Sequence, residues 1–468
     1  MSLSFLRAAE EFPDRVALVD RGLVHTYGSF APAVRGAMDR LARLGVRVRR
    51  PGPGPAALFT GSPETGTFAF LHALVEFGLP FAPLHPRLTP TEREEIARAC
   101  RPAVTLRRPR LLEPLEEGPV RKTESIPDDG RPLAIVFTSG STGKPKGVVL
   151  SRAAFVASAR ASEANLGWEE NDRWGLTMSL AHIGGLSVVT RALLARRAVV
   201  RAAPFDATNL ARAVQEERIT LLSLVPAMVR RLLDLDPPWT PPAHLRAILI
   251  GGGAVSERLL AEGNDRGLPL LPTYGLTETC SQVATARPGG AVATAAAPPL
   301  PGVEMRVREG RIQVRGPMTM TAYFPEDSCA SPYTDDGWLD TGDLGEIDGA
   351  GRVTVRGRAD DVVSTGGENV SLREVEEALV AYPGIAGAVA FGVEDDTWGV
   401  VVAAAVATKG GGDLDRAALD RFLRGRLAPH KRPRRLARIA SIPETPSGKP
   451  DRGAARRAAE RALEPFPG

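Results

Sequence analysis

A strand followed by a loop occupies residues 135–150, which read Ile135-Val-Phe-Thr-Ser-Gly-Ser-Thr-Gly-Lys-Pro-Lys-Gly-Val-Val-Leu150. The apolar run at the start predicts a buried strand, and the residues after it are mainly glycines, hydroxyl residues and lysines. Glycines let backbone N–H groups turn toward an anion, hydroxyl side chains add donors, and Lys144 and Lys146 add positive charge. The segment therefore predicts a loop that binds a polyphosphate.

Two other interpretations of this loop fit its spacing less well. A Walker P-loop requires the pattern G-x-x-x-x-G-K-[S/T], whereas Gly140 and Gly143 are only three residues apart and Lys144 precedes a proline. A flexible Ser/Gly linker has no need of a flanking apolar strand or of two lysines. A phosphate-binding loop of another type is the better interpretation.

The sequence on both sides of the loop alternates short apolar runs with amphipathic stretches. Strands are predicted at residues 56–60, 80–84, 221–225 and 247–250, and a helix at residues 67–77. This alternation is typical of α/β layers with largely parallel sheets. Strands that are buried on both faces read as continuous apolar runs, as these do.

The pattern changes after about residue 290. Residues 303–307, 311–315 and 352–356 alternate apolar and polar side chains, which predicts half-exposed antiparallel strands. Helices are expected at 372–379 and 416–427, and strands at 388–392 and 400–406. Ser371 is expected to cap the helix at 372–379 in a capping box with Glu374. We therefore expect an α/β protein in which residues 1–357 form layered sheets with a small β-barrel-like subdomain, and residues 358–468 form a small, mobile α+β domain.

Length and composition agree with this division. The chain has 468 residues, which exceeds the roughly 250–300 residues that one hydrophobic core can serve. A net charge of +4 on a chain of this length gives too weak an electrostatic field to indicate a nucleic-acid partner. The three cysteines form no CxxC pair, which favours a reduced, cytoplasmic chain without a zinc site. The N-terminus lacks the apolar core of a signal peptide, and no apolar run reaches the ~18 residues of a membrane span.

The basic residues are unevenly divided between arginine and lysine. Of the 59 cationic side chains, 53 are Arg and only six are Lys. A coding bias toward Arg explains most of this difference. Under such a bias, a Lys that remains is a candidate for a site where Arg cannot substitute.

Five segments, taken together, resemble the signature motifs of the adenylate-forming superfamily of acyl- and aryl-CoA synthetases, peptide-synthetase adenylation domains and luciferases. In chain order they are residues 138–147, Tyr274-Gly-Leu-Thr-Glu-Thr279, Gly337-Trp-Leu-Asp-Thr-Gly-Asp343, Gly357-Arg-Ala-Asp-Asp361 with Gly366-Gly-Glu-Asn369, and Pro446-Ser-Gly-Lys449. The resemblance implies two half-reactions. A carboxylate attacks the α-phosphate of ATP to give an acyl-adenylate, and a thiol, usually of CoA, then displaces AMP. ATP, Mg²⁺ and CoA are the implied cofactor and co-substrates.

The resemblance assigns the nucleotide to residues of several segments. ATP phosphates would contact Thr138, Ser139, Gly140, Ser141, Thr142, Gly143, Lys144 and Lys146. Adenine would lie against Tyr274, Gly275 and the loop formed by Gly251, Gly252, Gly253 and Ala254. Thr277 would contact the α-phosphate, and Glu278 would bind Mg²⁺, which prefers hard oxygen ligands. Without the motif, Glu278 would read as an acid favoured in the first turn of a helix. Asp343 would accept hydrogen bonds from the ribose, with Arg358 beside it.

The C-terminal motifs imply a catalytic lysine and a hinge. Lys449 is a mobile ammonium that would reach both the carboxylate and the α-phosphate. Rotation at Asp360 would then withdraw Lys449 and bring Gly366, Gly367 and Glu368 to the pantetheine arm of CoA. Many relatives carry Pro where this chain has Leu372, which leaves the shape of that loop open.

The resemblance narrows toward the o-succinylbenzoate–CoA ligases of menaquinone biosynthesis at His182-Ile-Gly-Gly-Leu-Ser187 and at residues 274–283. Such an acid carries a second, aromatic carboxylate that needs a cation or several donors. His182 would flank the reacting carboxylate and Arg191 would meet the second one, with further donors from Ser187, Ser281 and Gln282. By default, however, an arginine on a helix face is solvated. Many of those ligases also have Ser where this chain has Gly184, so a different acid stays open.

Three other functions remain as alternatives. The first is another aryl- or acyl-CoA synthetase. The second is a stand-alone adenylation domain that loads a carrier protein, which would be a separate chain because no carrier-like segment follows Lys449. The third, a non-catalytic nucleotide-binding relative, is disfavoured because Glu278 and Lys449 are both present. The expected partners are therefore a small carboxylic acid, ATP and CoA, and a homodimer is a family expectation.

Overall fold

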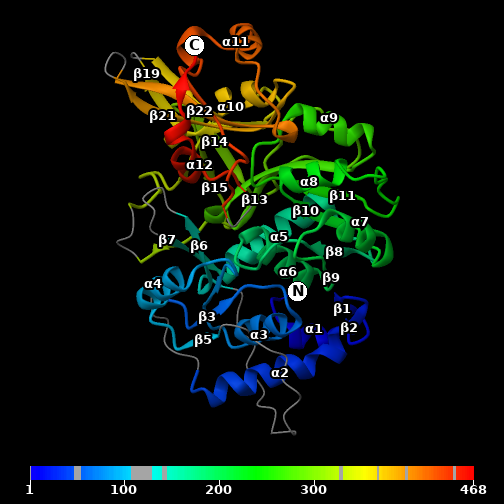
Figure 1. Cartoon of the computed structure of the whole chain (residues 1–468). Coiled ribbons are helices and arrows are strands. Elements are labelled where there is room, and N and C mark those ends of the chain that lie inside the picture. The colour runs from blue at the N-terminus through cyan, green and yellow to red at the C-terminus, as the bar shows by residue number, and fades with distance from the viewer. Residues whose placement is uncertain are drawn as a thin grey trace. The chain divides into compact units, whose positions relative to one another are not determined.

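The structure is a computed structural model that describes residues 2–46, 54–106, 129–139, 145–325, 330–365, 368–395, 399–445 and 449–467 (Figure 1). The chain divides into two compact units, one of residues 1–305 and 314–339 and one of residues 306–313 and 340–468. Residues 340–357, which the sequence assigns to the N-terminal domain, pack with the second unit. The boundary at residue 357 and the hinge beside it stay predictions.

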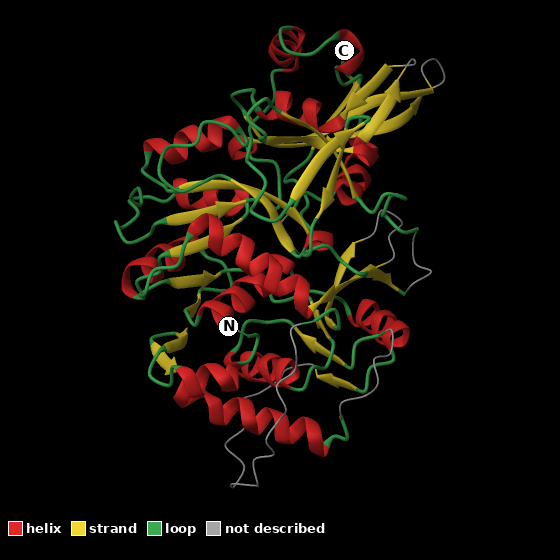
Figure 2. Cartoon of the chain, turned by 180° about the vertical axis from the view of Figure 1, so that it is seen from behind, coloured by secondary structure: helices red, strands yellow, loops and turns green. Residues whose placement is uncertain are grey.

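The larger sheet of the first unit, whose strands are yellow in Figure 2, has the strand order β13-β12-β11-β10-β8-β9-β1-β2. Its inner neighbours pair in parallel, whereas β1 with β2 and β12 with β13 are antiparallel. The predicted strands at 221–225 and 247–250 are confirmed as β10 and β11. The strands are β1 (Val16–Asp20), β2 (Leu23–Thr26), β8 (Arg173–Leu176), β9 (Ala198–Arg201), β10 (Leu221–Leu224), β11 (Ala247–Ile250), β12 (Leu270–Leu276) and β13 (Ser281–Thr285).

The second sheet of this unit has the order β16-β7-β6-β4-β3-β5. Its strands are β3 (Ala57–Thr60), β4 (Phe81–Leu84), β5 (Val104–Leu106), β6 (Pro132–Ser139), β7 (Pro145–Ser151) and β16 (Ala322–Phe324). β3 pairs in parallel with β4 and β5, while β7 is antiparallel to both β6 and β16. The predicted strands at 56–60 and 80–84 are confirmed, and the phosphate loop joins two antiparallel strands.

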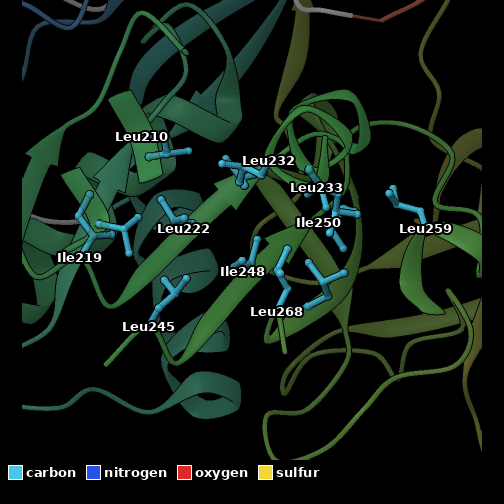
Figure 3. Close-up of a cluster of buried hydrophobic side chains, with 14 of the residues drawn as sticks. Leu210, Ile219, Leu222, Leu232, Leu233, Leu245, Ile248, Ile250, Leu259 and Leu268 are labelled. Atoms are coloured by element: carbon cyan, nitrogen blue, oxygen red, sulfur yellow. The ribbon is translucent and has the colours of Figure 1, made fainter. Parts of the chain in front are cut away.

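Helices cover these sheets. They are α1 (Phe5–Glu11), α2 (Tyr27–Arg43), α3 (Thr65–Glu76), α4 (Pro90–Cys100), α5 (Arg152–Leu166), α6 (Ile183–Ala195), α7 (Ala207–Glu216), α8 (Pro226–Leu233) and α9 (Glu257–Asp265). The helix predicted at 67–77 is α3, and it is buried along almost its whole length. Leucine and valine side chains of α7, α8 and α9 pack on the leucines and isoleucines of β10 and β11 in one core cluster (Figure 3). This core fixes the carboxyl ends of β11 and β12, where the predicted adenine residues lie.

The second unit combines antiparallel strands with helices. Most residues of the sheet β14-β15-β17-β18 belong to it, as do the hairpin β19-β20 and the sheet β21-β22-β23-β24. The strands predicted to form a barrel-like subdomain lie in the first of these sheets, whose order leaves β14 and β18 at the edges. The elements are β14 (Glu304–Arg308), β15 (Arg311–Arg315), β17 (Leu339–Ile347), β18 (Val353–Arg358), β19 (Val362–Thr365), β20 (Glu368–Ser371), α10 (Leu372–Val380), β21 (Ile385–Asp395), β22 (Gly399–Thr408), α11 (Arg416–Arg424), β23 (Arg435–Arg438), α12 (Arg452–Ala459) and β24 (Glu464–Pro465).

One local prediction in this unit is wrong. Ser371 is the N-cap residue of α10, but its side chain makes no capping hydrogen bond. Glu374, the expected partner in the capping box, instead accepts two hydrogen bonds of 2.8 Å from the Lys431 ammonium. A charge-assisted bond to an ammonium is stronger than one to a neutral backbone N–H, so Glu374 turns away from the cap.

No helix in the described ranges is both long enough and apolar enough to cross a membrane.

Candidate active site

The predicted phosphate loop falls between β6 and β7, which pair as an antiparallel hairpin. Thr138 lies opposite Lys146 in the register, and its hydroxyl donates to the Lys146 carbonyl at 3.4 Å. A Cβ atom at Gly147 would lie 2.6 Å from Ile135 and 3.3 Å from the Phe324 carbonyl, so glycine is needed where β7 is wedged between β6 and β16. The loop residues Gly140, Ser141, Thr142, Gly143 and Lys144, and the side chain of Ser139, lie outside the described part of the chain.

Glu278 meets Lys146 at the end of β12. The short turn η1 (Thr277–Thr279) follows β12 and carries both Thr277 and Glu278. The Lys146 ammonium lies 3.7 Å from Glu278 Oε1, and the Tyr323 hydroxyl donates to the same oxygen at 3.0 Å. The ammonium also lies 4.2 Å from the centroid of the Tyr323 ring. The structure thus joins two predicted residues to a third, Tyr323, that the sequence analysis missed.

The predicted adenine residues occupy the ends of the neighbouring strands β11 and β12. A Cβ atom at Gly251 would lie 2.5 Å from the Thr273 carbonyl, so the two strand ends can approach only if residue 251 is glycine. Gly252 has a φ of +73°, which glycine adopts without strain. Gly253 and Ala254 continue this loop, and Tyr274 and Gly275 lie at a register shift between β12 and β13.

Asp343 and Arg358 come together within the second unit. They are opposite each other on β17 and β18, and the Arg358 guanidinium donates to Asp343 Oδ1 at 3.1 Å and to the Thr341 carbonyl at 3.0 Å. Asp343 is buried, whereas the Arg358 side chain is about half exposed. An ion pair this open to solvent adds little stability, so its main effect is to orient the carboxylate.

The predicted hinge and CoA residues lie in connecting segments of the second unit. Asp360 is in the turn η3 (Ala359–Asp361), between β18 and β19. Glu368 begins β20, while Gly366 and Gly367 fall outside the described residues. Lys449 is exposed, and its backbone is held by Thr445 through hydrogen bonds of 2.7 Å and 3.2 Å. These positions are compatible with the predicted roles, which stay predictions.

The region predicted to bind the acid begins at His182, the N-cap residue of α6. Its ring centroid lies 4.9 Å from that of His85, a residue that had no signal in the sequence. Burial, followed by the charges of Arg87 and Arg93, lowers the pKa of His85 to about 4. His85 is therefore a neutral ring packed on His182. A side chain at Gly184 would meet only the flexible end of Met178, at 2.8 Å.

Arg191 is buried, so the alternative of a solvated arginine is wrong. Only 3% of it is exposed, and burial lowers its pKa to about 10. Its guanidinium donates to the Ser158 hydroxyl at 3.3 Å and lies 5.7 Å from the Trp174 ring centroid. Ser158 in turn donates to the Cys280 carbonyl at 2.7 Å, which links Arg191 to the turn that carries Glu278. Among the described residues, no Asp or Glu pairs with Arg191.

The other predicted acid-binding donors are engaged with nearby protein groups. The Ser187 hydroxyl donates to the Ile183 carbonyl at 2.7 Å, inside α6. The Gln282 amide donates to Thr273 and Thr285 at 3.1 Å and 3.0 Å, across the β12–β13 hairpin. Ser281 has a φ of 93° at the start of β13. Their roles toward an acid stay predictions.

The fold and its nucleotide motifs define the adenylate-forming class of enzymes. The chain belongs to the AMP-binding enzyme family, whose profile matches residues 5–324, and the profile of the AMP-binding enzyme C-terminal domain matches residues 374–449.

Three relatives illustrate the similarity. The 2-succinylbenzoate–CoA ligase of Bacillus licheniformis is 31% identical over 94% of this chain and 96% of that protein. The o-succinylbenzoate CoA synthetase from Bacillus subtilis, in complex with the acyl-adenylate intermediate OSB-AMP, is 28% identical over 97% of each chain, with a TM-score of 0.85. The complex of the same synthetase with ATP and magnesium ion has a TM-score of 0.84 over 97% of this chain and 98% of that chain. ATP-bound MatB from Rhodopseudomonas palustris is 25% identical over 98% and 99%, with a TM-score of 0.87.

Proposed function

We propose that the chain is an AMP-forming acid–CoA ligase whose acid is o-succinylbenzoate, in menaquinone biosynthesis. The observation that supports this reaction type is the short distance of 3.7 Å between the Lys146 ammonium and Glu278 Oε1. Both residues lie in the part of the chain that matches the AMP-binding enzyme family. The similarity to 2-succinylbenzoate–CoA ligases of Bacillus species supports this acid. MatB has an equally similar fold, so the acid has to be argued from the pocket residues rather than from the fold.

The first half-reaction brings a carboxylate to a polyphosphate, so the site must supply positive charge where negative charge develops. Lys146, with Lys144 in the loop, would supply part of it, and Thr277 would contact the α-phosphate. When bound, Mg²⁺ would neutralise phosphate oxygens. Glu278 fits this ion because Mg²⁺ in nucleotide enzymes is held by one or two carboxylates and by substrate phosphates.

The second unit would serve both half-reactions. Asp343, oriented by Arg358, would bind the ribose hydroxyls. Lys449 would bridge the acid and the α-phosphate during adenylation. Rotation at Asp360 would then replace Lys449 by the segment Gly366–Glu368 and admit CoA.

Arg191 is the residue that favours an acid with a second carboxylate. A buried charge without a partner is costly, because desolvation is not offset by a counter-ion. Such a cation is expected where a substrate anion supplies the missing charge. Arg191 reaches the Glu278 turn through Ser158 and the Cys280 carbonyl. We infer that it meets the aromatic carboxylate of the acid, while His182, packed on His85, flanks the carboxylate that is adenylated.

The decisive experiment measures ATP- and CoA-dependent release of AMP with a panel of acids. The panel contains o-succinylbenzoate, benzoate, a fatty acid and 3-benzoylpropionate, which lacks only the aromatic carboxylate. We expect o-succinylbenzoate to be consumed fastest. A much faster reaction with another acid would assign the chain to a different acyl- or aryl-CoA synthetase. Adenylate formation that CoA fails to accelerate would instead favour loading of a carrier protein.

The remaining expectations concern assembly and location. We propose a cytoplasmic location, because the cysteines show no pattern of disulfide partners. We also propose a homodimer, which sedimentation of the purified chain would test.

A further inference from the structure

Two side chains hold the same oxygen of Glu278. The Tyr323 hydroxyl donates to Oε1 at 3.0 Å, and the Lys146 ammonium lies 3.7 Å from that atom. Within the described part of the chain, no hydrogen bond reaches the second oxygen, Oε2. A carboxylate anchored at one oxygen presents the other in a fixed direction, which is what an ion with strict coordination geometry requires.

We propose that Tyr323 is a positioning residue for Glu278: its hydroxyl anchors Oε1 and leaves Oε2 to bind the divalent cation that accompanies ATP. This inference rests on the proposed function, because it concerns the nucleotide–metal complex of the adenylation step. Tyr323 itself acts through Glu278 and not on the reacting atoms. Its position follows from strand pairing between segments far apart in sequence, so no local motif predicts it.

The backbone around Tyr323 makes it a rigid support. β16 pairs with β7 in antiparallel register. Tyr323 lies opposite Val148, the residue that directly follows Gly147 on β7. Met320, just before β16, donates its N–H to the Glu278 carbonyl at 2.8 Å. One segment therefore holds Glu278 at two points, by its backbone through Met320 and by its side chain through Tyr323. The Tyr323 side chain is nearly buried, which limits its own movement.

The Tyr323 ring has a second contact that the test must preserve. The Lys146 ammonium lies 4.2 Å from the ring centroid, a distance at which a cation is attracted to an aromatic face. Tyr323→Phe keeps this face and removes only the hydroxyl. Tyr27→Phe is the matched control, because the Tyr27 hydroxyl donates to the Arg197 carbonyl at 3.2 Å and takes no part in holding Glu278.

The experiment measures the affinity of Mn²⁺, a paramagnetic substitute for Mg²⁺, for the complex of the full chain with ATP. Loss of one hydrogen bond to a carboxylate predicts that Tyr323→Phe weakens Mn²⁺ binding about tenfold, with metal-free ATP affinity unchanged. Tyr27→Phe should leave both affinities unchanged. An unchanged Mn²⁺ affinity in Tyr323→Phe, or an equal loss of metal-free ATP affinity, would overturn the proposal.

A double substitution separates positioning from a general structural effect. Glu278→Gln should itself weaken Mn²⁺ binding, and adding Tyr323→Phe to it should cause no further loss. A further tenfold loss in the double variant would show that the hydroxyl acts elsewhere. If the unmodified chain failed to bind metal–ATP at all, the proposed function would fail. If the unmodified chain bound metal–ATP and the Tyr323 substitutions left Mn²⁺ affinity unchanged, the positioning role alone would fail.

Discussion

Replacement of Arg191 by methionine is expected to stabilise the chain while it weakens use of the proposed acid. Methionine has a similar length and no charge, so it fills the same buried space between α6, α5 and the Cys280 turn. Burial lowers the pKa of Arg191 to about 10, well below the ordinary range of an arginine. At 1.36 kcal/mol for each pKa unit, keeping this group charged costs about 3 kcal/mol.

The contacts of Arg191 limit how much the substitution stabilises the chain. The variant loses the hydrogen bond to Ser158, which contributes about 1 kcal/mol, so the free energy of unfolding should rise by about 2 kcal/mol. For o-succinylbenzoate, the lost cation leaves a buried carboxylate without its partner. A loss of about 3 kcal/mol in transition-state stabilisation lowers kcat/KM roughly a hundredfold. For 3-benzoylpropionate, which lacks that carboxylate, kcat/KM should fall much less.

Arg196→Met is the matched control. Arg196 is also buried at the end of α6, but it pairs with Glu11 at 3.0 Å and with the Ser2 carbonyl at 3.1 Å. Its replacement breaks satisfied contacts, so it should lower stability and leave the preference between the two acids unchanged. Urea unfolding measures the first effect, and AMP release with both acids measures the second.

The result that would refute this reasoning is an Arg191→Met protein that is less stable than the unmodified chain. The buried charge would then be structural rather than held in reserve for a ligand. An equal loss of kcat/KM with both acids would also reject contact between Arg191 and the aromatic carboxylate, whatever the stability.

Two further predictions concern the nucleotide and the proposed catalytic lysine, Lys449. Lys449→Ala should abolish acid-dependent ATP–pyrophosphate exchange at an unchanged melting temperature, because the side chain is exposed; unchanged exchange would remove Lys449 from the mechanism. Gly251→Ala should raise the KM for ATP about tenfold, since its Cβ would collide with the Thr273 carbonyl at 2.5 Å, whereas Gly290→Ala, with open space around it, should not. Equal effects of the two glycine substitutions on KM would contradict a special role for the Gly251 approach.

Most of the fold follows from local patterns in the sequence. Continuous apolar runs located β3, β4, β10 and β11, and alternating patterns located β15 and β18, because burial on two faces or on one leaves a direct mark on residue order. The capping box at Ser371 failed for a reason that lies outside the local sequence. Lys431, which is 57 residues from Glu374, captured its carboxylate.

In the candidate site, too, some residues could be predicted from the sequence and others could not. Glu278, Lys146, Asp343 and Arg358 all belong to sequence motifs, so resemblance to a family could find them. The structure adds that Lys146 approaches Glu278 and that Asp343 and Arg358 lie opposite each other on adjacent strands. Tyr323 and His85 carry no motif. They reach the site by strand pairing and ring packing across long separations, and one sequence without structure contains no signal for either contact.

The arginine-to-lysine ratio shows how far composition can lead. It singles out Lys146, which approaches Glu278, but it equally singles out Lys431, whose ammonium holds both oxygens of Glu374 within the second unit. Both contacts use a compact ammonium, one near the proposed phosphate site and one in a structural ion pair. By contrast, Arg191 is a buried cation for which the described residues supply no acid partner, and no count of lysines would reveal it. Scarcity therefore yields candidates only, whereas burial without a nearby counter-charge is what marks Arg191 as a candidate ligand-binding residue.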